Sequence, residues 1–405
     1  MALQNLRSHL SKKRKMKKIF TILLSVLMLG VSMMSSCVKQ ADSSSESSVE
    51  TVETVPEGYV AETEAGLMFD EPENAKIYNY CPCVIVDGND GHVWYCSSVT
   101  ENIGGDDHIA YRHGKKVNGT WYWGPRQVIL TYEPDTWYSG NICDPDVVQG
   151  EFHYKGETYG WLMAVLGCTT KDNSANMFGF KVAKNPEGPW IDVPEISPLY
   201  DFYEYHPGYV YNGYNFIWGW GQCSLINLDK KGKVMLFYTG RSGTGQKLEY
   251  WDFSDLENPK GIYEAEVRNN GVLKLTGETD SICNAQFMYD EEKDRFYMIS
   301  DTHPFSSEEW PTNLPYSSRI YYLDNVTNRE LGYVFQYKKL EWKELFTLDE
   351  ERTGFARNHN CCFYRDPYGW KLPGDKLEVA YTMSETGADW KVLFTYRIYR
   401  YEYQL

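Results

Sequence analysis

The chain has 405 residues, carries a formal net charge of −16 at pH 7, and is rich in aromatic residues, with 33 Tyr and 13 Trp. A surface this acidic repels nucleic acid and anionic polymers, so it excludes those partners and favours neutral ones. The aromatic content has two compatible explanations. Tyr and Trp favour β-strands, and their rings also stack on the C–H faces of sugars.

The N-terminus has the character of a secretion signal. Residues 12–18, KKRKMKK, are basic, and the apolar run after them is too short to span a bilayer comfortably. That run ends in SSC at Cys37, and a Cys directly after small residues resembles the processing site of bacterial lipoproteins. We therefore expect a signal peptide over residues 1–36, with an upstream extension before Met16, and lipidation of Cys37. A plain secretory signal is the alternative.

A polar segment follows the signal. It begins VKQADSSSESSVETVETVPEG, which is rich in Ser and Glu and has little to bury, so residues 37–72 are predicted to be a flexible tether. Residues 73–405 are then the folded part. We expect the protein to be exported and held in the bacterial cell envelope, at the outer membrane, with the lipid as its only membrane contact.

Five segments of the folded part share one pattern. Each has a small or polar start, two or three apolar residues, a polar turn and an aromatic-rich strand, and the starts recur roughly every 60 to 80 residues. The starts are Tyr80, Cys143, Gly221, Ser281 and Arg357. No stretch after residue 60 has helical periodicity with caps. The pattern predicts an all-β fold, a five-bladed β-propeller, whose five segment starts converge on one pocket at the central axis.

Nine cysteines follow Cys37, so at least one is unpaired within the chain. Seven of them fall at the predicted blade starts, at positions 81, 83, 143, 223, 283, 361 and 362. Their strand parities differ, so they cannot all point at one ion. We predict that they are free, buried small residues, and neither a disulfide framework nor a metal centre.

Three motifs resemble one enzyme family. They are NMFGFKVAKNPEGPW from Asn176, CDPDVVQGEFHYKGETYGWLMAVLG from Cys143, and RNHNCC from Arg357. Each resembles a blade motif of the five-bladed propeller glycoside hydrolases, especially family 43, and together the resemblance covers roughly residues 75 to 405. The resemblance implies cleavage of glycosidic bonds with inversion, by a carboxylate base, a carboxylic acid and an Asp that tunes the acid.

The positions that correspond to those three carboxylates carry neutral groups in this chain. The base position is Cys81, the tuning position is Gln222, and the acid position is Cys283 or Asn284. His359 corresponds to the family histidine that points at the axis and helps hold a metal ion through water. The resemblance therefore implies an axial Ca or Na ion, which His359 would help to hold through a water molecule.

Two acids remain at the second blade start. Asp146 corresponds to the Asp of the family's Ala-Pro-Asp-Val strand, and we expect it to accept backbone N–H groups at the strand entrance, with ligand contact as the alternative. Asp144 replaces an Ala of the family motif and lies two residues away, on the same face of the strand. It is the first candidate for ligand contact or chemistry.

Other candidates lie in loops. Asp107 follows two glycines and is expected on a mobile loop, where it is either solvated or a second catalytic acid. Glu204 and His206 belong to an aromatic insertion before the third blade, which is expected to cover the pocket. The side chains expected to contact a sugar, besides Asp146 and His206, are Trp220, Gln222, Arg241, Asn284, His303 and His359.

Two functions are compatible with these residues, both with a neutral oligo- or polysaccharide as partner. One is a divergent glycosidase, in which Asp144 acts with Glu204 or Asp107. The other is a non-catalytic glycan-binding lipoprotein that has lost the hydrolase carboxylates. A second carboxylate across the pocket from Asp144, within roughly 5 to 10 Å, would favour the enzyme.

Overall fold

A computed structural model describes residues 54–71, 75–98, 106–171, 173–240, 245–326, 335 and 341–405. The predicted signal peptide, Cys37 and Arg241 lie outside the described residues. Within the described ranges, no helix has the length and apolar character needed to cross a membrane.

Five antiparallel units follow one another along the chain. The first contains β2 (Asn79–Asp87), β3 (Asp90–Ser98), β4 (Asp107–Val117), β5 (Thr120–Trp123) and β6 (Gln127–Leu130). The second contains β7 (Asn141–Tyr154), β8 (Glu157–Cys168), β9 (Met177–Ala183) and β10 (Ile191–Asp192), and the third β11 (Gly221–Asn227), β12 (Lys233–Thr239), β13 (Gln246–Asp252) and β14 (Lys260–Val267). The fourth contains β15 (Gln286–Asp290), β16 (Arg295–Phe305), β17 (Pro315–Asp324) and β18 (Lys343–Leu348), and the fifth β19 (Arg357–Arg365), β20 (Lys376–Ser384) and β21 (Arg397–Gln404).

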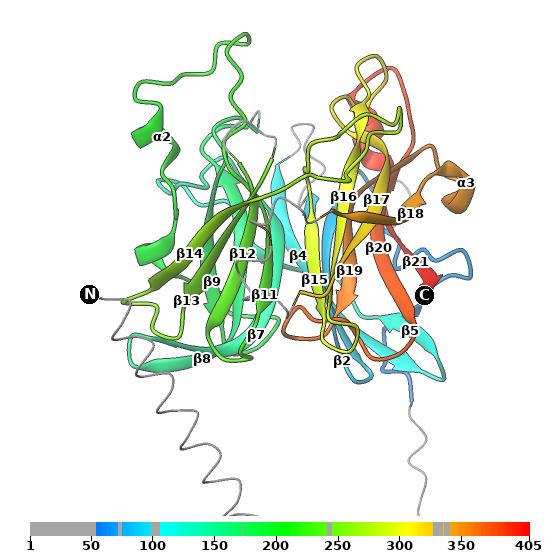
Figure 1. Cartoon of the computed structure of the whole chain (residues 1–405), viewed down its shortest axis with the longest axis horizontal. Helices are drawn as coiled ribbons and strands as arrows, with labels where there is room; N and C mark the ends of the chain where they lie inside the picture. Colours follow the sequence, from blue (N-terminus) through cyan, green and yellow to red (C-terminus); the bar gives the residue numbers. More distant parts are fainter. Residues whose placement is uncertain are drawn as a thin grey trace, which may run out of the picture. The chain divides into compact units, whose positions relative to one another are not determined.

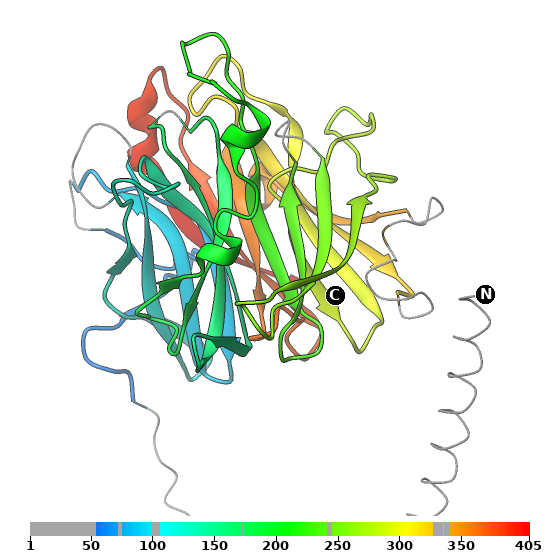
Figure 2. The same ribbon diagram turned by 90° about the vertical axis from the view of Figure 1, so that its left-hand side faces the viewer.

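The units are the blades of a β-propeller, which confirms the predicted fold class. In Figure 1 the first strands of the blades stand near the middle of the folded unit and the later strands lie outside them. The fifth blade meets the first through a parallel pairing of β19 with β2, where Tyr364 lies opposite Val84 and Arg365 opposite Ile85. The short helices are η1 (Pro194–Ile196), α2 (Phe202–Tyr205), α3 (Glu350–Thr353) and η3 (Trp390–Thr395). Figures 1 and 2 show the loops with α2 and η3 reaching the same end of the propeller.

The core lies between the blades. Each pair of adjacent blades encloses its own cluster of buried apolar residues. Between the third and fourth blades, for example, the rings of Phe237 and Phe287 stack with their centroids 3.9 Å apart. All nine residues of β19 are buried, because a first strand is covered by neighbouring blades on both faces. Behind their small or polar starts these strands carry short apolar runs, such as CCFY in β19, and this recurring pattern makes the blade starts recognisable in the sequence.

The propeller begins before residue 73, so the predicted tether over residues 37–72 is wrong for its last part. Residues 60–61 form β1, which pairs with β5, and Leu67 pairs with Tyr399 of β21. Met68 and Phe69 are buried in the core cluster between the first and fifth blades. Burial of these apolar side chains outweighs the polar composition from which a free chain was predicted.

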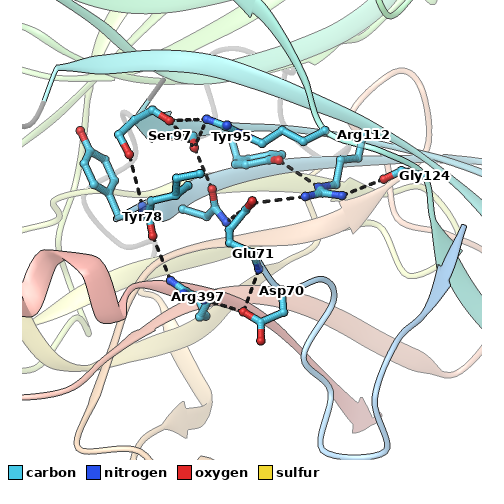
Figure 3. A network of polar contacts seen from close by, with 12 residues as sticks. Asp70, Glu71, Tyr78, Tyr95, Ser97, Arg112, Gly124 and Arg397 are labelled. Atoms are coloured by element: carbon cyan, nitrogen blue, oxygen red, sulfur yellow. Dashed lines mark hydrogen bonds and ion pairs between the residues drawn. The ribbon is translucent and has the colours of Figure 1, made fainter. Parts of the chain in front are cut away.

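Polar contacts fix this N-terminal segment to both blades, as Figure 3 shows. Glu71 Oε1 accepts hydrogen bonds from Asn79 Nδ2 at 2.8 Å and from the Arg112 guanidinium at 3.3 Å. Arg112 also donates to the Tyr95 hydroxyl. The neighbouring carboxylate, Asp70, pairs with Arg397 of β21 at 2.9 Å. The segment therefore contacts the first and the last blade together.

Candidate functional site

Five residues with left-handed backbone conformation surround the central axis, one at the start of each blade. Their φ angles lie between 46° and 51°, and we call them the axial ring: Cys81, Asp144, Gln222, Asn284 and Asn360. In four of the five blades the first strand shifts register at this point, as from Cys143 to Asp146 in β7. Such a bulge turns one side chain out of the ladder and towards the axis. Asp and Asn tolerate this conformation better than most residues, whereas Cys81 and Gln222 adopt it at an energetic cost.

The axial ring lines two cavities. The smaller, of about 40 Å³, touches all five ring residues and lies deeper along the first strands. The larger, of about 490 Å³, is called the axial pocket here. Its polar lining consists mainly of amides: Asn173, Asn176, Gln222, Asn284, Asn313 and Asn360. Its aromatic lining consists of Tyr80, Phe216, Trp218, Phe305 and Tyr396. The blade starts thus meet at one pocket.

Asp144 is the one carboxylate that lines the axial pocket within the described part of the chain. Its side chain is surrounded by thiols, and the Cys96 Sγ lies 3.5 Å from its Oδ1. Burial raises the pKa of Asp144, while contacts with Cys81, Cys96 and Cys143 act in the opposite direction. Among the described residues, no basic side chain contributes to the pKa shift of Asp144.

Asp146 has a different environment, although it lies only two residues away. It forms a fully buried ion pair with Arg365, whose terminal nitrogen lies 2.8 and 2.9 Å from the two carboxylate oxygens. Asp146 also accepts the Leu225 backbone N–H and the Gln286 side-chain amide. The carboxylate lines the smaller cavity, but its oxygens already accept hydrogen bonds from protein groups. This is the role expected for an Asp that accepts backbone N–H groups at a strand entrance.

Asp107 is not on a loop. It is the first residue of β4 and is buried, because the hydroxyls of Tyr78 and Tyr80 donate to its two oxygens at 2.6 and 3.0 Å. Burial raises its pKa to about 7, with the tyrosine hydrogen bonds acting against the rise. Asp107 does not line the axial pocket, but Tyr80 does. The Tyr80 ring therefore lies between this carboxyl group and any ligand.

His359 does not line either cavity, and its neighbour Asn360 lines both. The imidazole is fully buried, with Nδ1 2.6 Å from Asn360 Oδ1 and Nε2 3.2 Å from the Ser384 hydroxyl. Burial lowers the pKa of His359 to about 4. Both ring nitrogens are engaged with protein groups, so these residues do not fit an axial ion held through His359.

The remaining predicted residues divide between pocket and periphery. Gln222 and Asn284 line both cavities, and the Asn284 amide is held by Asp301 Oδ2 at 2.7 Å. Glu204 lies exposed on α2 and does not line the pocket. The others, away from the pocket lining, are His206 packed on Phe202, Trp220 buried in the core, and His303 paired with Asp280 and stacked on Phe305.

Sequence reasoning missed the aromatic residues that do line the pocket. Phe216 and Trp218 belong to the aromatic insertion that is predicted to cover the pocket. The prediction therefore has the right segment, but it names other residues of that segment. Tyr396 follows η3 in the last blade, and no local pattern distinguishes it from its many tyrosine neighbours. Their convergence depends on loops that only the folded chain brings together.

The arrangement can bind more readily than it can hydrolyse. Glycosidic cleavage uses two carboxyl groups on opposite sides of the bond. Asp144 faces amides and aromatic rings across the axial pocket, Asp146 is neutralised by Arg365, and Asp107 is covered by Tyr80. Within the described residues, the pocket therefore lacks the second carboxylate that would favour an enzyme.

No protein-family model matches the chain, and neither does any curated protein. Solved structures similar to it are glycoside hydrolases. An α-L-arabinofuranosidase from Podospora anserina, crystallised with cellotriose, is 10% identical over 85% of this chain and 96% of its own, with a TM-score of 0.49. A family 117 enzyme from Zobellia galactanivorans is 12% identical, covering 85% and 87%, with a TM-score of 0.48. A thermostable family-43 enzyme is 13% identical, covering 82% and 91%, with a TM-score of 0.45.

These solved structures belong to the same broad class of enzymes, glycoside hydrolases, as the family that the sequence motifs resemble.

Proposed function

We propose that the protein binds a neutral oligosaccharide in the axial pocket and does not hydrolyse it. The observation that carries this proposal is the lining of the pocket, which combines amides and aromatic rings with a single carboxylate. Amide groups both donate to and accept from sugar hydroxyls, and aromatic faces stack on the sugar ring. A volume of about 490 Å³ is in the range of small-ligand sites.

The neutral character of the ligand is supported by charge. The chain carries 56 acidic and 40 basic residues, and the described pocket lining contains a carboxylate and no Lys or Arg. An anionic sugar would meet repulsion from both the surface and Asp144. A neutral glycan has no such penalty.

The location of the protein is a separate proposal that depends on the sequence alone. We propose export and lipid anchoring through Cys37 in the bacterial cell envelope, with the propeller displayed at the outer membrane. Mass spectrometry of the mature N-terminus tests it. A diacylated or triacylated Cys37 is the expected result, and an unmodified residue at a different cleavage position would contradict it.

Trp218→Ala is expected to weaken oligosaccharide binding by about tenfold or more, equivalent to ~1.4 kcal/mol, because it removes a stacking surface from the pocket. The measurement is a screen of neutral oligosaccharides followed by calorimetric titration of those that bind. Tyr122→Ala is the matched control, since Tyr122 is half-buried on β5 and does not line the pocket. Its affinity should equal that of the wild-type protein.

The same glycans and their aryl glycosides are incubated with the protein to test turnover. Binding without product release is expected. Product release that disappears in Asp144→Asn would overturn the non-catalytic proposal and restore the divergent glycosidase. Absence of binding to every neutral glycan in the screen would overturn the choice of ligand.

A further inference from the structure

Three thiols from three strands gather around Asp144 at the wall of the axial pocket. They are Cys81 in β2, Cys96 in β3 and Cys143 in β7. One ligand atom each from Cys81, Cys96 and Asp144 lie within 4.8 Å of one another. Cys143 packs against Cys96 in the same cluster. This grouping combines soft sulfur donors with one hard oxygen donor.

The spacing fits a small tetrahedral ion. With bond lengths of about 2.3 Å to sulfur and 2.0 Å to oxygen, two ligands of a tetrahedral zinc ion lie about 3.5 Å apart. The Cys96 Sγ and Asp144 Oδ1 are separated by 3.5 Å. The Asp144 backbone N–H also donates to the Cys96 Sγ at 2.8 Å, a hydrogen bond that would stabilise a thiolate at that position.

The charge environment points the same way. Asp146 has a buried arginine as counter-ion, whereas the carboxylate of Asp144 lies beside thiol groups and forms no ion pair with a basic side chain among the described residues. A buried carboxylate without a counter-charge is costly, and a divalent cation supplies the missing charge. Thiolate ligands select zinc-like ions over calcium and magnesium.

Residues of the cluster line both cavities. Asp144 lines the axial pocket and the smaller cavity, Cys143 lines the first and Cys81 the second. Cys96 lies behind them and is fully buried. Three protein ligands leave one position of a tetrahedral ion for water, and the pocket provides the space for it.

We propose that Cys81, Cys96 and Asp144 bind one zinc-like divalent cation, with its fourth position open to the axial pocket. Binding converts the two thiols to thiolates, so about two protons are released per ion. This site is distinct from the axial ion that the sequence resemblance implied at His359. It does not depend on whether the pocket holds a glycan.

The test is a cobalt titration of the reduced full chain without oxygen, because Co²⁺ reports thiolate ligands by absorption. We expect one Co²⁺ per chain, a sulfur-to-cobalt charge-transfer band, and displacement by Zn²⁺. Cys81→Ser and Cys96→Ser should each lose the band, and Asp144→Asn should weaken binding by about tenfold or more. Cys223→Ser is the control, because Cys223 is a buried thiol of the smaller cavity outside the cluster.

Absence of the band in folded wild-type protein would overturn the proposal, as would a band that persists in Cys96→Ser. If the serine variants do not fold, alkylation of the cysteines of the wild-type protein, with and without Zn²⁺, tests the proposal instead. Zn²⁺ should protect Cys81 and Cys96 from iodoacetamide under mild denaturant and leave Cys223 unprotected. Equal labelling of all three with and without zinc contradicts the site.

Discussion

Replacing Arg365 with methionine is expected to lower the free energy of unfolding by about 3–5 kcal/mol, because Asp146 is then left buried without its counter-ion. Arg365 also donates to the carbonyl oxygens of Leu225 and Phe287, so it links the last blade to the second, third and fourth. The measurement is urea unfolding followed by tryptophan fluorescence.

Lys247→Met is the control for this variant. Lys247 pairs with Glu266 on an exposed strand, where a salt bridge contributes about 1 kcal/mol at most. The double variant Asp146→Leu/Arg365→Met should recover much of the loss, because it removes both buried charges together. A loss in Arg365→Met no larger than that in Lys247→Met would show that the axial ion pair does not hold the blades together.

Asp107→Asn is expected to change how stability depends on pH. The pKa of Asp107 is about 7 in the folded protein and 3.8 as its ordinary value, so between these values the folded state binds more protons than the unfolded state. The stability that this carboxyl group contributes therefore falls as pH rises from about 4 to 7, by on the order of 4 kcal/mol. The asparagine cannot titrate, so the variant should gain stability relative to wild type as pH rises through that window.

Urea unfolding at pH 4.5 and pH 8 checks this expectation as a difference between variant and wild type. The difference between the two proteins cancels the contributions that other buried groups make to the pH dependence of stability. Examples are Asp301, with a pKa of about 7, and His359, with a pKa of about 4. Asp135→Asn, at an exposed position, should leave the pH dependence unchanged. A variant–wild-type difference at Asp107 that is constant with pH would place the carboxylate in a far more solvated environment.

The propeller and the positions of its blade starts could be predicted because both depend on local pattern. First strands are buried on both faces and read as short apolar runs, and their recurrence indicates blades. The axial ring follows from the same alignment, since Gln222 and Asn284 occupy equivalent places in their blades. The alignment does not determine which side chain next to each blade start faces the pocket. In the fifth blade, for example, it predicts His359, but the neighbouring residue Asn360 lines the pocket.

Other features depend on contacts between distant parts of the chain. Two glycines before Asp107 favoured a loop, but the hydroxyls of Tyr78 and Tyr80 draw its carboxyl group into the core. Cys96 lies within a hairpin and at no blade start, so nothing local places its sulfur beside Asp144 of the next blade. The thiol cluster is therefore visible only once the first and second blades are packed together.

The N-terminal segment and β21 have a consequence for how the molecule is made. Glu62 forms an ion pair with Arg400, 338 residues further along the chain, and the Arg400 backbone N–H donates to the Gly66 carbonyl at 2.7 Å. A ribosome releases the early blades long before it has made this partner strand. The N-terminal segment and the side of the first blade that faces the fifth blade therefore remain without their partner until synthesis is almost complete. Truncation within β21 should leave the edge of β20 and the N-terminal segment without their partner, and an uncovered strand edge makes the chain prone to aggregate.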